Sequence, residues 1–247
     1  MRLLTSLLLT PLLLAAATPH PAQAQAPVIT PAGDPSVRSD SIYRLAVNAE
    51  DYPDEPFVYL LDDGVARFEA DGTGRRTYRQ VVQLLKQEAV EDWAEQQFGY
   101  SPGHQRLTIN WIRVVRPDGS VVSDKPTVSQ DADIPATISN PVYSDRKVRR
   151  VSLSGVAAGT IVDYSYTIEE LKPMRPGDFF ATWGVSTGHL TRRSRYLVDL
   201  PASMTPHLTE RNLTFPRRTT VAGGRRTYLW ATADVARVKP ELYAADS

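Results

Sequence analysis

Apolar and polar residues alternate along most of the chain after Tyr52-Pro53, and turn-forming residues recur at short intervals. A period of two is typical of half-buried β-strands. The pattern predicts strands over residues 57–61, 65–70, 77–85, 107–115, 121–122, 147–153, 161–171, 179–185, 194–200, 205–209 and 226–232. Two turns, at residues 62–64 and 71–74, are expected to join the first three strands into a meander.

Two short helices interrupt this pattern. Ser39-Asp40 is a candidate N-cap for a helix that runs to about Asn48. Residues 87–97 place Val90, Trp93 and Ala94 at helical spacing, with acidic residues on the other side. Many short strands with one or two small helices predict an all-β fold, a β-sandwich of antiparallel sheets.

The connections carry further expectations. Pro117-Asp118-Gly119 is expected to form a hairpin turn, and residues 126–145 a long ordered loop. Residues 155–159 are expected to pair the strand 147–153 with the strand 161–171. In that last strand Tyr164 and Tyr166 alternate with polar residues, which predicts one buried and one solvated face.

The N-terminus has the features of a cleaved secretory signal. Arg2 precedes an apolar run over residues 3–17, and Ala22-Gln23-Ala24 is a small-x-small cleavage site. The run is shorter than a membrane span requires, so stable membrane insertion is not expected. We predict an exported protein, periplasmic or secreted, divided into a signal peptide (1–24), a flexible leader (25–38), a β-sandwich domain (39–235) and a linker (236–247).

The amino-acid composition excludes several kinds of functional site. The chain has 247 residues, no cysteine and equal numbers of basic and acidic residues, 28 each. This excludes disulfides, zinc-thiolate sites and a cysteine nucleophile, and the balanced charge argues against nucleic acid as a partner. His104, His189 and His207 lack a second ligand at typical metal spacing. We therefore expect no metal and no cofactor.

Residues 184–188 form a literal G-x-S-x-G around Ser186. In α/β-hydrolases this serine sits on a strand-to-helix turn, whereas the segment after it here reads as another strand. A hydrolase that uses Ser186 is therefore the third hypothesis, and a structural turn is preferred. Glu169 and Glu170 are neighbours on a strand and point to opposite faces, so they cannot act as a glycosidase pair.

Basic residues cluster at residues 146–150, 192–195, 217–218 and 225–226. Lys147 and Arg149 share one face of a strand, which could serve a polyanion or glycan. Charged strand ends that protect sheet edges are the preferred interpretation.

Several landmarks recur in a fixed order: Asp51-Tyr52-Pro53, Val58-Tyr59-Leu60-Leu61-Asp62-Asp63-Gly64, Tyr78-Arg79-Gln80-Val81-Val82, Phe98-Gly99-Tyr100, Arg116-Pro117-Asp118-Gly119, Pro141-Val142-Tyr143-Ser144-Asp145, Gly155-x-x-x-Gly159, Tyr164-x-Tyr166-x-x-Glu169 and Pro176-Gly177-Asp178-Phe179. In this order they resemble the DUF3857 family over roughly residues 46–234. The resemblance implies an N-terminal module of exported bacterial proteins that precedes a transglutaminase-like domain with a Cys-His-Asp triad.

The resemblance implies no catalytic residue in this chain. The leading hypothesis is a non-catalytic accessory or docking module for a transglutaminase-like domain, in cis or in trans. The alternative is a module that binds a cell-wall glycan or another cell-envelope polymer. Pro141, Val142, Tyr143, Ser144 and Asp145 are the preferred contact surface, because they are polar and aromatic without periodicity. An apolar docking surface is expected beside the C-terminal segment, residues 227–243.

Overall fold

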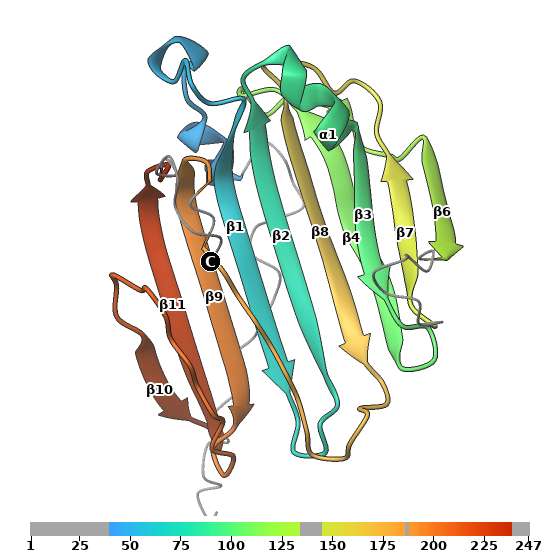
Figure 1. Ribbon diagram of the computed structural model, residues 1–247, viewed down its shortest axis with the longest axis vertical. Coiled ribbons are helices and arrows are strands. Elements are labelled where there is room, and N and C mark those ends of the chain that lie inside the picture. Colours follow the sequence, from blue (N-terminus) through green and yellow to red (C-terminus); the bar gives the residue numbers. More distant parts are fainter. Residues whose placement is uncertain (1–39, 134–144, 186–187, 239–247) are drawn as a thin grey trace, which may run out of the picture.

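Backbone hydrogen bonds join the strands into two sheets (Figure 1). The computed structural model describes residues 40–133, 145–185 and 188–238. The strands are β1 (Phe57–Phe68), β2 (Gly74–Leu84), β3 (Glu95–Tyr100), β4 (Gln105–Val115), β5 (Val121–Ser123), β6 (Val128–Asp133), β7 (Lys147–Ser152), β8 (Ile161–Glu170), β9 (Thr191–Pro201), β10 (Arg218–Ala222) and β11 (Arg225–Val235). The helical turns are η2 (Ser41–Leu45), η3 (Ala49–Asp51), η4 (Gln87–Ala89) and α1 (Val90–Ala94).

The large sheet has eight strands in the order β10-β11-β9-β1-β2-β8-β4-β5. Its neighbours are antiparallel except β1 and β9, which run parallel, so the sheet is mixed. β8 and β9 therefore point the same way, and the chain between them must return along the sheet. Residues 171–190 supply that crossover, which is the length that a parallel pair requires.

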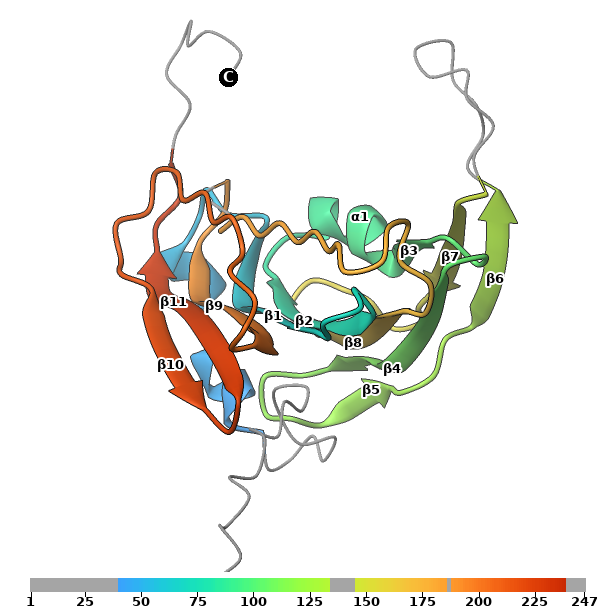
Figure 2. The same ribbon diagram turned by 90° about the horizontal axis from the view of Figure 1, so that it is seen from below.

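A smaller sheet, β3-β7-β6, packs with α1 against one face of the large sheet (Figure 2). Phe98 of β3, Val151 of β7 and Trp93 of α1 meet apolar residues of β2, β4 and β8 in one buried cluster. A second cluster on this face places Phe179 and Trp183 of the crossover against β1, β9 and β11. The expected fold class is confirmed, with the mixed sheet as a refinement.

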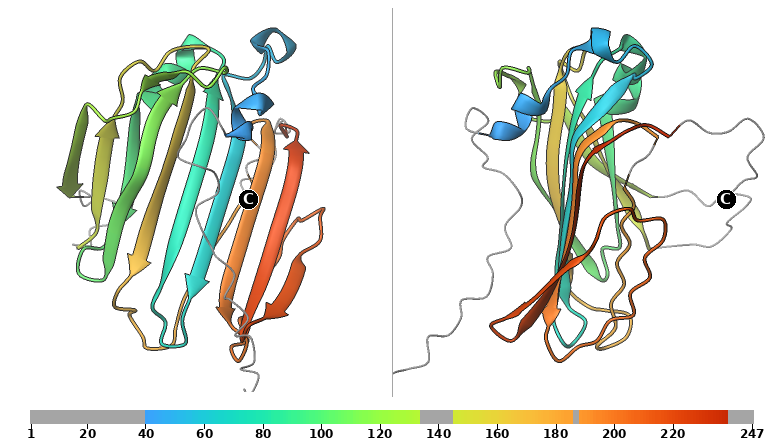
Figure 3. Two further views of the ribbon diagram at one scale, coloured as in Figure 1. Left: turned by 180° about the vertical axis from the view of Figure 1, so that it is seen from behind. Right: turned by 90° about the vertical axis from the view of Figure 1, so that its left-hand side faces the viewer.

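The opposite face of the large sheet is covered at one end by η2 (Figures 2 and 3). Asp40 caps this helical turn, because its side chain accepts a hydrogen bond from the Ile42 amide at 3.0 Å. Tyr43 is 3% exposed and packs on Val58, Leu61 and residues around them. The predicted helix over residues 39–48 is thus shorter, and a second turn, η3, begins after Asn48.

The turn predicted at residues 62–64 was wrong, because β1 passes through it without interruption. Asp62 and Asp63 are buried in the strand, where Gln80 and Arg195 supply hydrogen bonds. Gly64 lies under an aromatic ring: a Cβ there would stand 2.5 Å from Trp183. Glycine serves close packing here rather than a turn. The turn at residues 71–74 is confirmed.

Other predictions of strands and strand pairs were wrong because the strands pair with segments that are distant in the sequence. The strand at residues 147–153 pairs with β3 and β6, and not with residues 161–171, which pair with β2 and β4. Residues 95–97 belong to β3 rather than to a helix, and residues 128–133 form β6 within the expected loop. Residues 179–185 and 205–209 are not strands, and β10 was not predicted.

Candidate functional site

The face of the large sheet toward η2 carries a cluster of charged side chains that are almost fully buried. Asp163 of β8 is at its centre and has no exposed surface. Arg79 of β2 and Arg113 of β4 flank it and are 1% and 4% exposed. Strand register explains the convergence, because Asp163 pairs across the sheet with Val81 on one side and with Arg113 on the other.

Asp163 accepts hydrogen bonds from four side chains. Arg79 donates Nε at 3.1 Å and Nη2 at 2.9 Å, and Arg113 donates Nε at 3.0 Å and Nη2 at 2.7 Å. Trp111 donates Nε1 at 3.0 Å, and the Tyr43 hydroxyl donates from η2. Both guanidinium groups also lie over the Trp111 ring, 5.4 and 5.3 Å from its centre.

The cluster extends to the start of the described chain. Arg79 Nη2 donates to Asp40 at 2.6 Å, and the Asp40 side chain is only 8% exposed. Asp40 thus caps η2 and pairs with Arg79, so the same residue fixes the helical turn and attaches it to the sheet. The cluster, defined as Asp40, Arg79, Arg113 and Asp163 with Tyr43 and Trp111, is called the buried charge cluster below.

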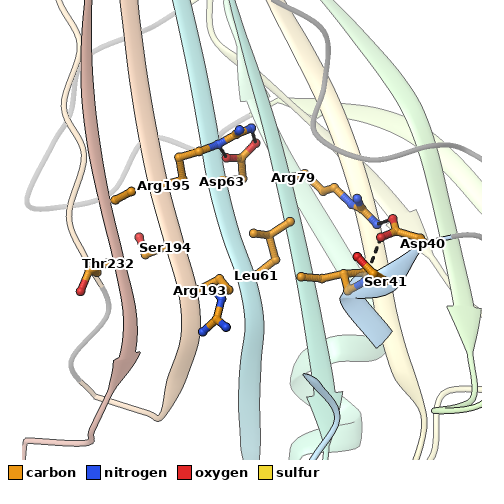
Figure 4. Close-up of a pocket in the computed structure, with 11 residues that line it drawn as sticks. Asp40, Ser41, Leu61, Asp63, Arg79, Arg193, Ser194, Arg195 and Thr232 are labelled. Carbon is orange, nitrogen blue, oxygen red and sulfur yellow. Dashed lines mark hydrogen bonds and ion pairs between the residues drawn. The ribbon is translucent and has the colours of Figure 1, made fainter. Parts of the chain in front are cut away.

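Beside this cluster the sheet surface is hollowed into an open groove of about 380 Å³. It lies between η2 and β11 and crosses β1 and β9; its lining includes Asp40, Leu61, Asp63, Arg193, Arg195 and Ala231. Figure 4 shows the Arg79–Asp40 pair at one side, the Arg195–Asp63 pair at another and Leu61 between them. Arg195 holds Asp63 with Nε and with Nη2, the latter at 2.9 Å.

Burial and charge act in opposite directions on the carboxylates of this sheet. Burial alone would raise the pKa of Asp163, but Arg79, Arg113 and Tyr43 outweigh it and hold that pKa below its usual value. Asp62 lies on the other face and has no cationic partner among the described residues. Its burial raises the pKa to about 6, against a hydrogen bond from Gln80 that lowers it. Asp163 is therefore a structural anion, whereas Asp62 is held with a pKa raised to about 6.

A histidine–carboxylate pair lies at the end of the sheet where β1 and β9 begin. His189 Nδ1 is 3.0 Å from Oε2 of Glu55, whose side chain is 8% exposed. The imidazole also rests on Phe57, with ring centres 4.0 Å apart. A carboxylate that orients a histidine is one part of a catalytic triad. The sequence pattern did not identify Glu55, because it lies 134 positions from His189.

The remaining sequence candidates do not converge on a reaction centre. Ser186 lies outside the described residues, so the preference for a structural turn stays a prediction. Glu169 pairs with Arg106, and Glu170 with Arg76 and Gln105. His104 Nδ1 contacts the Lys172 carbonyl at 2.9 Å, and His207 is exposed. Among the described residues, no group of three His, Asp or Glu side chains could hold a metal ion.

Of the preferred contact surface, Pro141, Val142, Tyr143 and Ser144 lie outside the described residues, and Asp145 is exposed. The basic face of β7 is neutralised across the strand pair: Lys147 contacts Asp133 at 2.8 Å, and Arg149 contacts Asp131 at 2.6 Å. Because β7 is the central strand of the small sheet, these pairs join it to the edge strand β6 and do not test edge protection. They neutralise the basic residues that a polyanion would contact.

A row of aromatic rings crosses the concave face of the large sheet. Trp183 stacks between Tyr196, at 4.9 Å and 6°, and Tyr78, at 6.1 Å and 0°. Trp230 follows beside Tyr196, with Arg217 5.8 Å from its centre. A sugar stacks on an open ring face, and here neighbouring side chains occupy these faces. The row therefore acts as core, which argues against the glycan alternative at this position.

The expected apolar surface beside the C-terminal segment is small in the described residues, where Val221 and Val238 are exposed. The most exposed large apolar side chains are instead Met174 (93%) and Phe180 (78%), on the crossover after β8. That part of the crossover is held against the β1–β2 turn by a hydrogen bond from the Gly177 amide to the Asp71 carbonyl at 2.7 Å.

Sequence reasoning missed the charged groups that organise the sheet. Asp163 stands between Val162 and Tyr164, and the alternation assigned it to solvent. Arg79 shares its strand face with Val81, which is buried, and this is the signal that could have located the cluster. An arginine on an apolar strand face needs a buried carboxylate.

These features define a mostly β domain of two packed sheets, with ion pairs on one face and a half-open groove beside them. The DUF3857 family, described as a domain of unknown function with a solved structure, matches residues 70–239. The chain belongs to this family. No curated protein matches the sequence significantly. The described residues contain no helix long and apolar enough to cross a membrane.

Among solved structures, a "putative protease" from Parabacteroides distasonis is similar at a TM-score of 0.67 and 15% identity. The likeness covers 78% of this chain but 38% of that protein, so the chain corresponds to a minor part of its length. An M1 zinc metallopeptidase from Deinococcus radiodurans is similar at a TM-score of 0.38 and 11% identity, over 72% of this chain and 39% of that protein.

We expect Asp163→Asn to destabilise the protein strongly. The substitution keeps the side-chain size but leaves Arg79 and Arg113 without their shared buried anion. Breaking one partner of a buried ion pair costs about 3–5 kcal/mol. Urea unfolding at pH 7 measures this loss. Asp131→Asn, which removes a partly exposed ion pair, is the control and should cost about 1 kcal/mol or less. Equal losses for the two variants would contradict the structural role of Asp163.

We expect Asp62→Asn to stabilise the protein at pH 7. A carboxyl whose pKa is raised to about 6 on folding keeps its proton in the native state between pH 4 and 6. The unfolded chain has already released it there, so stability falls as the pH rises through this window. Asparagine still accepts the Gln80 hydrogen bond and removes this fall, which we expect to be worth about 1–3 kcal/mol. Unfolding curves between pH 4 and 7 test the effect, and parallel pH profiles for both proteins would contradict it.

Proposed function

We propose that this protein is a non-catalytic accessory domain that docks onto a transglutaminase-like or peptidase-like catalytic domain, in cis or in trans. The observation that carries the proposal is the likeness to 38% of a larger protein described as a protease, together with membership of the DUF3857 family. A fold that recurs as a minor part of a longer chain is suited to support a separate catalytic domain.

The charge arrangement supports the same role. Asp163 and Asp131 accept hydrogen bonds from arginine, which lower the pKa of both carboxyls. A carboxylate committed in this way is a poor general base, because its ionised form is already stabilised. The His189–Glu55 pair has the geometry of a base and its orienting group, and it makes a hydrolase the competing function that the experiment must address.

The experiment combines an activity assay with a binding assay. We expect the purified protein alone to hydrolyse no fluorogenic peptide or ester and to bind the transglutaminase-like domain encoded with it, produced as a separate polypeptide, in a 1:1 complex by calorimetry. A DUF3857 domain from an unrelated protein is the binding control. Turnover by the protein alone that Ser186→Ala, Glu55→Gln or His189→Ala abolishes would contradict the proposal.

We also propose that the protein is exported and that signal peptidase cleaves it after Ala24. The n-region, the short apolar run and Ala22-Gln23-Ala24 support this. We expect the protein in the periplasm or medium to begin at Gln25 by N-terminal sequencing, and its unfolding midpoint to be insensitive to reductant. Ala24→Tyr should block cleavage, because the site requires a small residue, whereas Ala46→Ser is the control. Full-length precursor in the membrane fraction of the unaltered protein would contradict export.

A further inference from the structure

The ion pairing of the groove beside the buried charge cluster is incomplete. Arg79 and Arg113 share Asp163 and Asp40, so two cations meet two anions. On β9, Arg193 and Arg195 line the groove, and of their partners Asp234 and Asp63 only Asp63 does so. Asp234 is held more closely by Arg192, which is not part of the lining. Among the residues that line the β9 side of the groove, positive charges therefore exceed negative charges by one.

Of the three arginines Arg192, Arg193 and Arg195, Arg193 has the weakest ion pair. It is 3.5 Å from Asp234, which Arg192 holds more closely at 2.9 Å, and its side chain is 44% exposed. Arg195 uses Nε and Nη2 for Asp63, and within the described chain Nη1 makes no hydrogen bond. Its side chain is 39% exposed, although its partner Asp63 is 2% exposed. Both guanidinium groups therefore have N–H groups that could donate hydrogen bonds to a bound anion.

The distance between the two arginines indicates how far apart the negative charges of a matching ligand must be. Arg193 and Arg195 are two residues apart on β9 and line the same groove, so their Cα atoms are about 7 Å apart. Carboxylates two residues apart on an extended peptide have the same spacing and face one way. The groove is open rather than enclosed, which suits a peptide better than a small molecule that must be largely buried.

We propose that this groove binds an extended acidic peptide segment of the docking partner, with carboxylates at alternate residues on Arg193 and Arg195. This names the partner chemistry for the docking function proposed above and rests on it. β11 contributes Ala231 and Thr232 to the side of the groove opposite η2.

The test is a calorimetric titration of the purified protein at low salt. The probe is a blocked five-residue peptide with two glutamates separated by one alanine, and the control peptide has glutamines in their place. We expect a submillimolar Kd for the acidic peptide, at least tenfold weaker binding of the glutamine peptide, and loss of affinity as NaCl is raised. Binding of both peptides with equal affinity would overturn the proposal.

Variants locate the site. Arg193→Glu should weaken binding of the acidic peptide at least tenfold, and Arg193→Gln by a smaller factor in the same direction. Arg106→Glu is the matched control: Arg106 is exposed and paired with one carboxylate, but lies on β4, four strands from β9. It should change the Kd less than twofold. Unaltered binding by both Arg193 variants, with unchanged thermal unfolding, would overturn the assignment.

A third titration uses glutarate, which has two carboxylates but no peptide backbone. We expect it to bind at least tenfold more weakly than the acidic peptide, and equal affinity would overturn the peptide assignment in favour of a small dicarboxylate. The titrations need no catalytic domain. Failure of the groove to bind peptide is therefore distinguishable from failure of the protein to dock onto its partner.

Discussion

The buried carboxylate of Asp163 is the constraint on which this structure depends. It lies in the middle of the large sheet without solvent contact, and two guanidinium groups neutralise it from neighbouring strands. A buried ion pair adds little net stability over an apolar packing of equal volume, but it tolerates few alternative arrangements. The tyrosine that completes the site comes from η2. The pairing thus fixes where the N-terminal turn meets the sheet.

This attachment explains why charged residues at one end of the face opposite the small sheet are buried. η2 covers the end that holds Asp163, and Tyr43 brings its ring to the apolar residues there. Between η2 and β11 the cover stops, and the groove begins. The position of the groove is therefore a consequence of the ion pairs that hold η2. Loss of Asp40 or Arg79 would be expected to alter the groove wall as well as stability.

The sequence predicted those strands in which apolar and polar residues alternate regularly. β2, β4, β9 and β11 were identified, because their apolar residues recur every second position and turn residues bound them. The strand predictions failed where a buried polar residue is hydrogen-bonded to a partner on another strand. Asp62 and Asp63 read as a turn, but partners on β2 and β9 keep them in a strand. Partner strands of β7 were also missed, since pairing with β3 and β6 depends on packing that no local pattern contains.

The docking site that we propose lies where the internal charge pairing of the domain is incomplete. Most ion pairs on the two sheets join residues that are already held by strand register, and an incoming anion would gain nothing by competing for them. Arg193 differs, because it shares Asp234 with Arg192 and remains exposed. Exposed pairs of this sort contribute about 1 kcal/mol or less, so exchanging one for a better placed carboxylate costs little. The weakness of this ion pair, which makes it unimportant for folding, is what supports the proposed docking site.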